Sequence, residues 1–270
     1  MTPRISLLVP FRPTTPQRER VWLWLERYWR HELPGVEIIV GSSTRTPFSK
    51  TEAVNDAARR ARGQIFVILD SDAYLRGRII RHCATRIEQA LQRGERLWYM
   101  PYRHLYRLTE TATETILCCD PRSPPRFERG LPRSILETPR SAAYGHRYGA
   151  MIQIMPREAF NLVGGMDPRF AGWGGEDVAF LRALDTLYCP HRTLTASIFH
   201  LWHPAIGSSP LSKRWKDQPR AGSNSKLTYR YFLAQARPED MRALVDEPRP
   251  TLAKRIAHLW QTVIGFFRRR

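Results

Sequence analysis

The sequence predicts an α/β fold in which a mixed, mostly parallel sheet carries helices on both faces. Apolar strand-like runs alternate with helix-like patterns over the first part of the chain. A strand is expected at 5–9, a helix from Gln17, a second strand from Val36, a helix near 51–62 and a third strand at 64–70. Such alternation is typical of βαβ units, whose ligands bind beyond the carboxyl ends of the strands.

The length of the chain bears on its domain organisation, and its net charge bears on its binding partners. The chain has 270 residues and 42% hydrophobic content, which suits one large catalytic domain, expected at 1–235, followed by a basic helical tail at 236–270. Lysine and arginine number 43 against 25 acidic residues, so the net charge is +18. This excess favours a phosphate-rich partner, an anionic membrane or an acidic substrate.

The cysteines and the apolar runs bear on the compartment. The four cysteines, Cys83, Cys118, Cys119 and Cys189, show no CxxC spacing, which favours a reducing environment without structural zinc. The sequence enters a strand-like run at once, and no apolar stretch approaches the roughly 20 residues of a membrane span. A cytoplasmic protein, soluble or peripheral on a membrane, is therefore expected.

Two carboxylates separated by one residue end the third strand. Asp70 closes the apolar run, and Ser71 and Asp72 follow it. Carboxylate oxygens suit Mg²⁺ or Mn²⁺, and the end of a buried strand is where an α/β nucleotide enzyme places metal and phosphate chemistry. The alternative interpretation is a plain turn.

A glycine-rich turn precedes a second acid pair in the segment GGMDPRFAGWGGEDVAF. Gly174 and Gly175 separate Trp173 from Glu176 and Asp177, and the apolar residues that follow recur at helical spacing. Glycines permit positive φ angles or close approach of a ligand, and the indole offers an apolar plate. The pattern indicates a sugar site, although acids that merely cap a helix remain an alternative.

Histidines end a later strand-like run in TASIFHLWHP. His200 ends the run directly and is the expected metal ligand, completing a site with the aspartates. His203 is expected to cap the strand or to pack beside Trp202 rather than to ligate the metal. The order DSD, GWGGED, HLWH is more specific than any of the three motifs alone.

These motifs resemble the GT-A glycosyltransferases, especially family 2 and the β-1,4-galactosyltransferase and polypeptide N-acetylgalactosaminyltransferase types. The resemblance rests on VPFR, FSKTEAVNDAARRARGQIFVILDSDAYL, REAFNLVGGMDPRFAGWGGED and IFHLWHP. It covers roughly residues 4–204, with a poor match at 103–147.

The resemblance implies a nucleotide-sugar donor, usually a UDP-sugar, and a bound Mn²⁺ or Mg²⁺. Carried over by position, the implied donor-binding residues are Pro10, Phe11, Arg12, Lys50, Asn55, Asp70 and Trp173. Asp72 would ligate the metal, with Asp70 contacting the metal or the ribose. One departure concerns the base, because Gly41, Ser42 and Ser43 stand where many family 2 members carry an aspartate pair.

The resemblance also assigns roles to the residues of the segment GWGGED. Trp173 would contact donor and acceptor sugars, with Gly174 and Gly175 beside the acceptor. Glu176 would bind sugar hydroxyls, and Asp177 would be the base. In an inverting transfer the acceptor hydroxyl attacks the anomeric carbon, so a carboxylate must take its proton. The expected activity is metal-dependent transfer of a hexose or N-acetylhexosamine to an acceptor hydroxyl of a glycan, lipid-linked sugar, protein or modified nucleic acid.

Three segments have less defined expectations. The Pro- and Arg-rich stretch 118–148 predicts a long loop over the site or an insertion without a role in the chemistry, and 206–225 is polar and basic. The tail 251–270 predicts a basic amphipathic helix that lies on an anionic membrane or docks on its own core or a second subunit.

A basic nucleic-acid-binding protein without catalysis is the alternative function. It is suggested by the charge and by aromatic residues interleaved with arginine in RVWLWLERYWR and YRHLYRL. That spacing equally suits amphipathic helices, and this alternative leaves DSD, GWGGED and HLWH unexplained.

Overall fold

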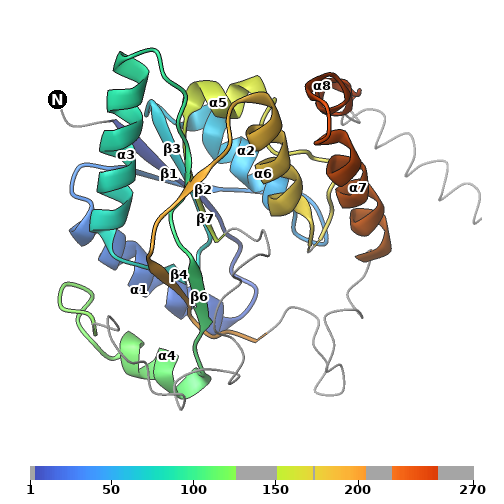
Figure 1. Cartoon of the computed structure of the whole chain (residues 1–270). Coiled ribbons are helices and arrows are strands. Elements are labelled where there is room, and N and C mark those ends of the chain that lie inside the picture. Colours follow the sequence, from blue (N-terminus) through green and yellow to red (C-terminus); the bar gives the residue numbers. More distant parts are fainter. Residues whose placement is uncertain (1–3, 126–150, 173, 205–220, 249–270) are drawn as a thin grey trace, which may run out of the picture.

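A computed structural model describes residues 4–125, 151–172, 174–204 and 221–248, and its architecture is a sheet between helices (Figure 1). The central sheet has the strand order β2 (Glu37–Gly41), β1 (Ile5–Pro10), β3 (Ile65–Leu69), β7 (Ile152–Pro156), β5 (Tyr99–Met100) and β8 (Arg192–Thr193). Strands β2, β1 and β3 are parallel, and β5 is parallel to β8. Strand β7 alone runs against its neighbours β3 and β5. The predicted α/β class with a mostly parallel sheet is confirmed.

Helices cover both faces of this sheet. The described helices are α1 (Pro16–Glu32), α2 (Lys50–Arg60), α3 (Gly77–Gln92), α4 (Glu110–Leu117), α5 (Arg157–Leu162), α6 (Glu176–Leu187), α7 (Ala221–Ala234) and α8 (Pro238–Asp246), of which α4, α7 and α8 pack on other helices. Helices α1 and α3 lie on one side, and α2, α5 and α6 lie on the other (Figure 1). Among the described residues, no helix has the length and apolar character needed to span a membrane.

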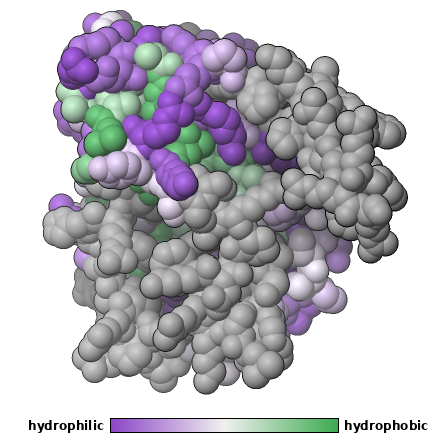
Figure 2. Space-filling view, turned by 90° about the vertical axis from the view of Figure 1, so that its right-hand side faces the viewer, coloured by the Kyte–Doolittle hydropathy of each residue, from purple (hydrophilic) through white to green (hydrophobic). Residues whose placement is uncertain are grey.

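Helices α7 and α8 form a C-terminal pair that packs on α6. They lie together at one side of the molecule, which Figure 2 shows face-on. The expected boundary at residue 235 falls between them, and α8 therefore packs with the part of the chain that precedes it. The amphipathic tail 251–270 lies outside the described residues.

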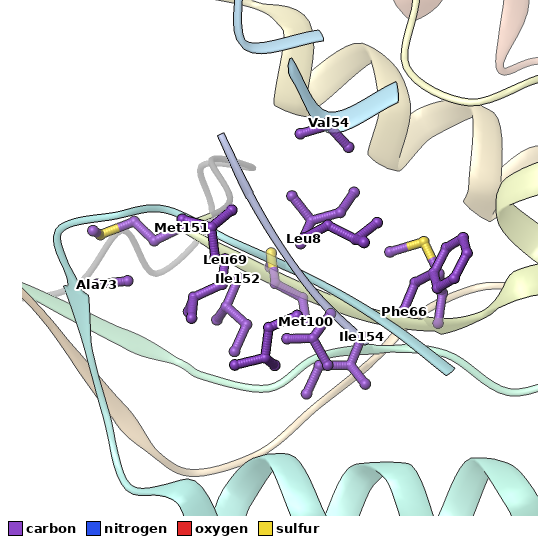
Figure 3. Close-up of a cluster of buried hydrophobic side chains, with 14 of the residues drawn as sticks. Leu8, Val54, Phe66, Leu69, Ala73, Met100, Met151, Ile152 and Ile154 are labelled. Atoms are coloured by element: carbon purple, nitrogen blue, oxygen red, sulfur yellow. The ribbon is translucent and has the colours of Figure 1, made fainter. Parts of the chain in front are cut away.

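Core side chains lie on both faces of the central sheet, because successive side chains of a strand point to opposite faces. Leu8 of β1 lies beside Val54 of α2, whereas Ile152 and Ile154 of β7 lie on the other side with Met100, towards α3 (Figure 3). All of these side chains are buried. The sheet is apolar on both faces, as expected of strands covered by helices.

Aromatic residues of α1 belong to this core. Thr15 caps the helix by accepting a hydrogen bond from the Arg18 N–H at 3.2 Å, and Pro16 begins it. Four aromatic side chains of the helix are buried: Trp22, Trp24, Tyr28 and Trp29. They are not available to stack on bases, so packing of α1 in the core explains the aromatic pattern of RVWLWLERYWR.

A second, small sheet brings distant motifs together. It consists of β4 (Ala73–Tyr74), β9 (Ser197–His200) and β6 (His104–Arg107). Strand β4 follows Asp72 directly, and its antiparallel register pairs Ala73 with His200. This pairing places DSD and HLWH side by side at the carboxyl end of β3.

Candidate active site

One cluster of possible metal ligands consists of Asp72, His200 and His203. Their ligand atoms all lie within 4.8 Å of one another. Asp72 Oδ2 is 2.9 Å from His203 Nε2 and 3.8 Å from His200 Nε2. Both histidines of HLWH therefore reach the second aspartate of DSD, including His203, which was expected to cap the strand or to pack beside Trp202 instead.

The state of these side chains fits a bound cation. Burial alone would raise the pKa of Asp72, but His200, His203 and Arg18 hold it well below its usual range, so the carboxylate is ionised. Burial lowers the pKa of His200 to about 4, which keeps its imidazole neutral at pH 7. His203 Nδ1 lies 2.9 Å from the Pro204 carbonyl oxygen, and its Nε2 lies 2.9 Å from Asp72 Oδ2. One carboxylate and two imidazoles suit a divalent ion.

Arg18 adds a cation that the sequence did not single out. One of its guanidinium nitrogens, Nη1, lies 3.3 Å from His203 Nε2, and Nη2 lies 3.9 Å from Asp72 Oδ2. Its Nε is buried and has no hydrogen-bond partner in the described part of the chain. The first turn of α1 aims Arg18 at the cluster, but nothing in the sequence distinguishes it among 43 basic residues.

A second cluster joins the two acid motifs through a lysine. Lys50 Nζ is 2.6 Å from Asp70 Oδ1, and it is 2.8 Å and 3.0 Å from the two carboxylate oxygens of Asp177. Lys50 begins α2, Asp70 follows β3, and Asp177 is in the first turn of α6. The structure therefore brings Lys50 and Asp70 together with Asp177, which lies more than a hundred positions later in the sequence.

Burial and charge act against each other in this cluster. Burial raises the pKa of Asp70 to about 6, although Lys50 lowers it. The pKa of Asp177 is also raised, by burial and by the nearby Glu176 and Asp70. Burial alone would lower the pKa of Lys50, but Asp177 and Asp70 raise it, so the ammonium stays charged.

The loop before α6, residues 166–175, which we call the acid loop, has a backbone that only glycines accommodate easily. Gly174 and Gly175 have φ angles of +104° and +90°, and Gly175 is the N-cap of α6. A Cβ atom at Gly175 would lie 2.0 Å from the Thr228 hydroxyl oxygen of α7. Glu176 is buried, and its Oε2 has no hydrogen-bond partner among the described residues. The acids therefore do more than cap a helix at the surface. Trp173 lies outside the described residues.

Two asparagines hold the two ends of this loop in the same way. Asn55 of α2 donates to the Met166 carbonyl at 2.7 Å and accepts from the Met166 N–H at 2.9 Å. Asn224 of α7 donates to the Ala171 carbonyl at 3.0 Å and accepts from the Ala171 N–H at 3.3 Å. The Asn55 amide is thus occupied by the loop, and its contact with a donor stays a prediction.

The remaining expected donor residues lie at the ends of β1 and β2. Pro10 ends β1, and the Phe11 ring lies 5.8 Å from that of Trp22. Arg12 donates to the carbonyls of Ser43 and Arg45. The Arg12 guanidinium also lies over the Phe48 ring, 5.2 Å from its centre. These contacts link the PFR segment to the loop that follows β2.

Asp70 and Asp72 separate into the two clusters. Asp70 was expected at the donor and at the metal, but it binds Lys50, and the described ligand cluster contains only the second aspartate. Contact of Asp70 with a metal or a ribose stays a prediction. Ser42, from the segment that departs from the family 2 pattern, donates to Asp56 instead.

Comparison with known proteins agrees with the sequence motifs. Residues 137–188, less than half of the chain, match the family described as the N-terminal domain of galactosyltransferase. Human chondroitin sulfate N-acetylgalactosaminyltransferase 2 is 26% identical over 164 residues, which is 60% of this chain and 28% of the relative. The chain thus spans under a third of that relative's length. These matches confirm the resemblance to glycosyltransferases.

Solved structures of similar proteins are also glycosyltransferases. The catalytic domain of Drosophila β-1,4-galactosyltransferase 7 in complex with xylobiose has 16% identity and a TM-score of 0.44, over 84% of this chain and 79% of that one. A mannosyltransferase from Pyrobaculum calidifontis in complex with GDP-Man and Mn²⁺ has 14% identity and a TM-score of 0.41, over 96% and 69%. Scores this low describe a loose superposition and carry nothing about individual residues.

We predict that Asn224→Ala loosens the acid loop. The variant removes two hydrogen bonds and leaves the Ala171 N–H and carbonyl without these partners, which should lower the free energy of unfolding by about 1–3 kcal/mol. Hydrogen exchange should quicken at 166–175. Asn161→Ala, at an exposed position on α5, is the control. Equal stability and equal exchange in both variants would contradict the role assigned to Asn224.

Proposed function

We propose that this protein is a metal-dependent, inverting glycosyltransferase that moves a hexose or N-acetylhexosamine from a nucleotide-sugar to an acceptor hydroxyl. One observation carries the proposal. The DSD segment joins a carboxylate and imidazole cluster suited to a divalent ion to a partly buried lysine and carboxylate cluster that contains a candidate base. Sugar transfer from a diphosphate needs both functions beside each other, one for the leaving group and one for the attacking hydroxyl.

The leaving-group side consists of Asp72, His200, His203 and Arg18. A divalent ion held by the first three would stabilise the negative charge that develops on the departing diphosphate. Two imidazoles favour a transition ion such as Mn²⁺ over Mg²⁺. Arg18, whose guanidinium already borders the cluster, would donate hydrogen bonds to diphosphate oxygens.

The attacking side consists of Asp177 with Lys50 and Glu176. Asp177 takes the proton of the acceptor hydroxyl as that oxygen forms its bond to the anomeric carbon. Its carboxylate is bound by Lys50, so an approaching hydroxyl must share Asp177 with the ammonium. The charge of Lys50 favours the ionised carboxylate against the effect of burial. The unpartnered Glu176 Oε2 is available to accept from a sugar hydroxyl.

The relatives narrow the proposed donor. The matched family is named for galactosyl transfer, and the human relative for N-acetylgalactosaminyl transfer. We therefore propose a UDP-linked galactose or N-acetylgalactosamine as the first donors to test. A thermal-shift screen with Mn²⁺ should show a larger shift for UDP-sugars than for GDP- or TDP-sugars. A preference for another nucleotide would reject the UDP assignment and point to the Gly41–Ser43 departure.

We expect Asp177→Asn to abolish most of the transfer while donor affinity is kept. An amide cannot take the proton, and loss of a general base costs about 10²- to 10⁴-fold in rate. Turnover is measured as release of the nucleotide diphosphate in the presence of an acceptor, and donor affinity by calorimetry. Asp185→Asn is the matched change on the same helix, where Asp185 binds His191. Full turnover by the Asp177 variant would eliminate it as the base.

The metal assignment predicts that both histidines matter. His200→Ala and His203→Ala should each weaken Mn²⁺ binding at least about tenfold, or 1.4 kcal/mol, because each loses a ligand. His82→Ala, an exposed position on α3, should change nothing. Manganese affinity is read directly by electron paramagnetic resonance, without a turnover assay. If only one variant loses affinity, the other histidine is not a ligand.

A further inference from the structure

Exposed apolar side chains gather on one face of α7. Tyr229, Phe232 and Leu233, which we call the α7 stripe, are 59%, 47% and 53% exposed. They are three of the five large hydrophobic side chains exposed among the described residues, and the other two, Leu23 and Val40, lie singly on α1 and β2. Single exposed apolar residues are ordinary, but a group on one helix indicates a contact surface.

The α7 stripe is held in an ordered arrangement. The opposite face of α7 buries Leu227, Tyr231 and Ala234 against the rest of the protein. On the exposed face the rings of Tyr229 and Phe232 stack with centres 5.9 Å apart, and the Arg182 guanidinium of α6 lies 5.0 Å from the Phe232 centre. The helix is thus docked on one face and presents aromatic side chains on the other.

Among the described residues, three cations border the stripe, and one of them, Arg230, is paired with Glu247. Arg182 borders it on α6, and Lys226 and Arg230 stand on α7 itself. Helix α7 contains no acidic residue in its 14 positions. Figure 2, which faces this side, shows hydrophobic residues set among hydrophilic ones. A cationic border around an apolar centre matches an anionic lipid surface, because the cations meet headgroups while the rings enter the interface.

The residues that follow α8 return to the border of the α7 stripe. Glu247 binds Arg230 on the border of the stripe, with Glu247 Oε2 at 3.1 Å from Arg230 Nη1, and the description ends one residue later. The following segment 251–270 is apolar and basic and, like α7, has no acidic residue. Because α7 and segment 251–270 both carry basic and no acidic residues, their charges do not favour contact with each other. The charges of both favour contact with an anionic bilayer.

We infer that the α7 stripe is a docking surface for an anionic lipid bilayer. Tyrosine and phenylalanine suit the boundary between headgroups and acyl chains, and surface cations add attraction to it. Asn224 of the same helix holds the acid loop at Ala171. If the proposed transfer is correct, docking brings that loop to the membrane and favours a lipid-linked acceptor.

The test is flotation of the full-length protein with vesicles of equal parts phosphatidylcholine and phosphatidylglycerol, compared with phosphatidylcholine alone. The variant replaces Tyr229, Phe232 and Leu233 together by serine, and Leu23→Ser is the matched loss of an exposed apolar residue elsewhere. We expect the triple variant to bind anionic vesicles at least about tenfold more weakly, Leu23→Ser to bind normally, and neutral vesicles to bind little in every case.

Two results would overturn the inference. One is equal vesicle binding by the triple variant and the unchanged protein. The other is protease protection of 251–270 in the absence of lipid that the triple variant abolishes, because the stripe would then be the dock of the chain's own end. Unchanged thermal unfolding shows that the triple variant is folded. Transfer to a soluble acceptor, read separately, distinguishes failure of this inference from failure of the proposed transferase.

Discussion

The partly buried ion cluster of Lys50, Asp70 and Asp177 is the constraint on which the arrangement of the site depends. Charges taken out of water are costly unless they are paired, and removing one partner of a buried pair typically costs about 3–5 kcal/mol. These three side chains come from α2, β3 and α6, so pairing them fixes the ends of three elements at one point. The cluster therefore acts as a structural tie, and the charge of Lys50 opposes the effect of burial on the pKa of Asp177, the proposed base.

The carboxyl end of β3 divides the site into two parts. Asp70 still follows the strand, and the chain then turns, with the Ala73 N–H donating to the Asp70 carbonyl at 3.0 Å. The turn sends Asp72 towards His200 at the end of β9 and His203 just after it, while Asp70 remains with Lys50. Two acids that look equivalent in the sequence consequently have different partners and opposite pKa shifts, Asp70 upward and Asp72 downward.

Local pattern was enough to predict the βαβ beginning and the residue types of the site. The strands near residues 5, 36 and 65 are where the apolar runs predicted them, because a strand buried on both faces leaves a continuous apolar signal. The small sheet that joins β4 to β9 was not predicted, since two-residue strands carry no period. Arg18 and His203 were undervalued for a related reason, because their place at Asp72 arises from long-range pairing. Likewise, the lysine between Asp70 and Asp177 is a tertiary fact that spacing alone does not contain.

The C-terminal helices explain how the acid loop keeps one conformation at its two glycines with positive φ angles. Gly174 and Gly175 can adopt positive φ angles, but glycines are also conformationally free, so other parts of the fold must hold the loop in one conformation. Asn224 and Thr228 of α7 lie against the loop from outside, and Asn55 of α2 holds its other end from inside. Helix α7 is in turn tied down, because Tyr231 donates to Asp167, which also binds Arg169. The loop is therefore positioned by elements on both sides of it, so a contact made by the outer face of α7 is one helix away from the candidate base.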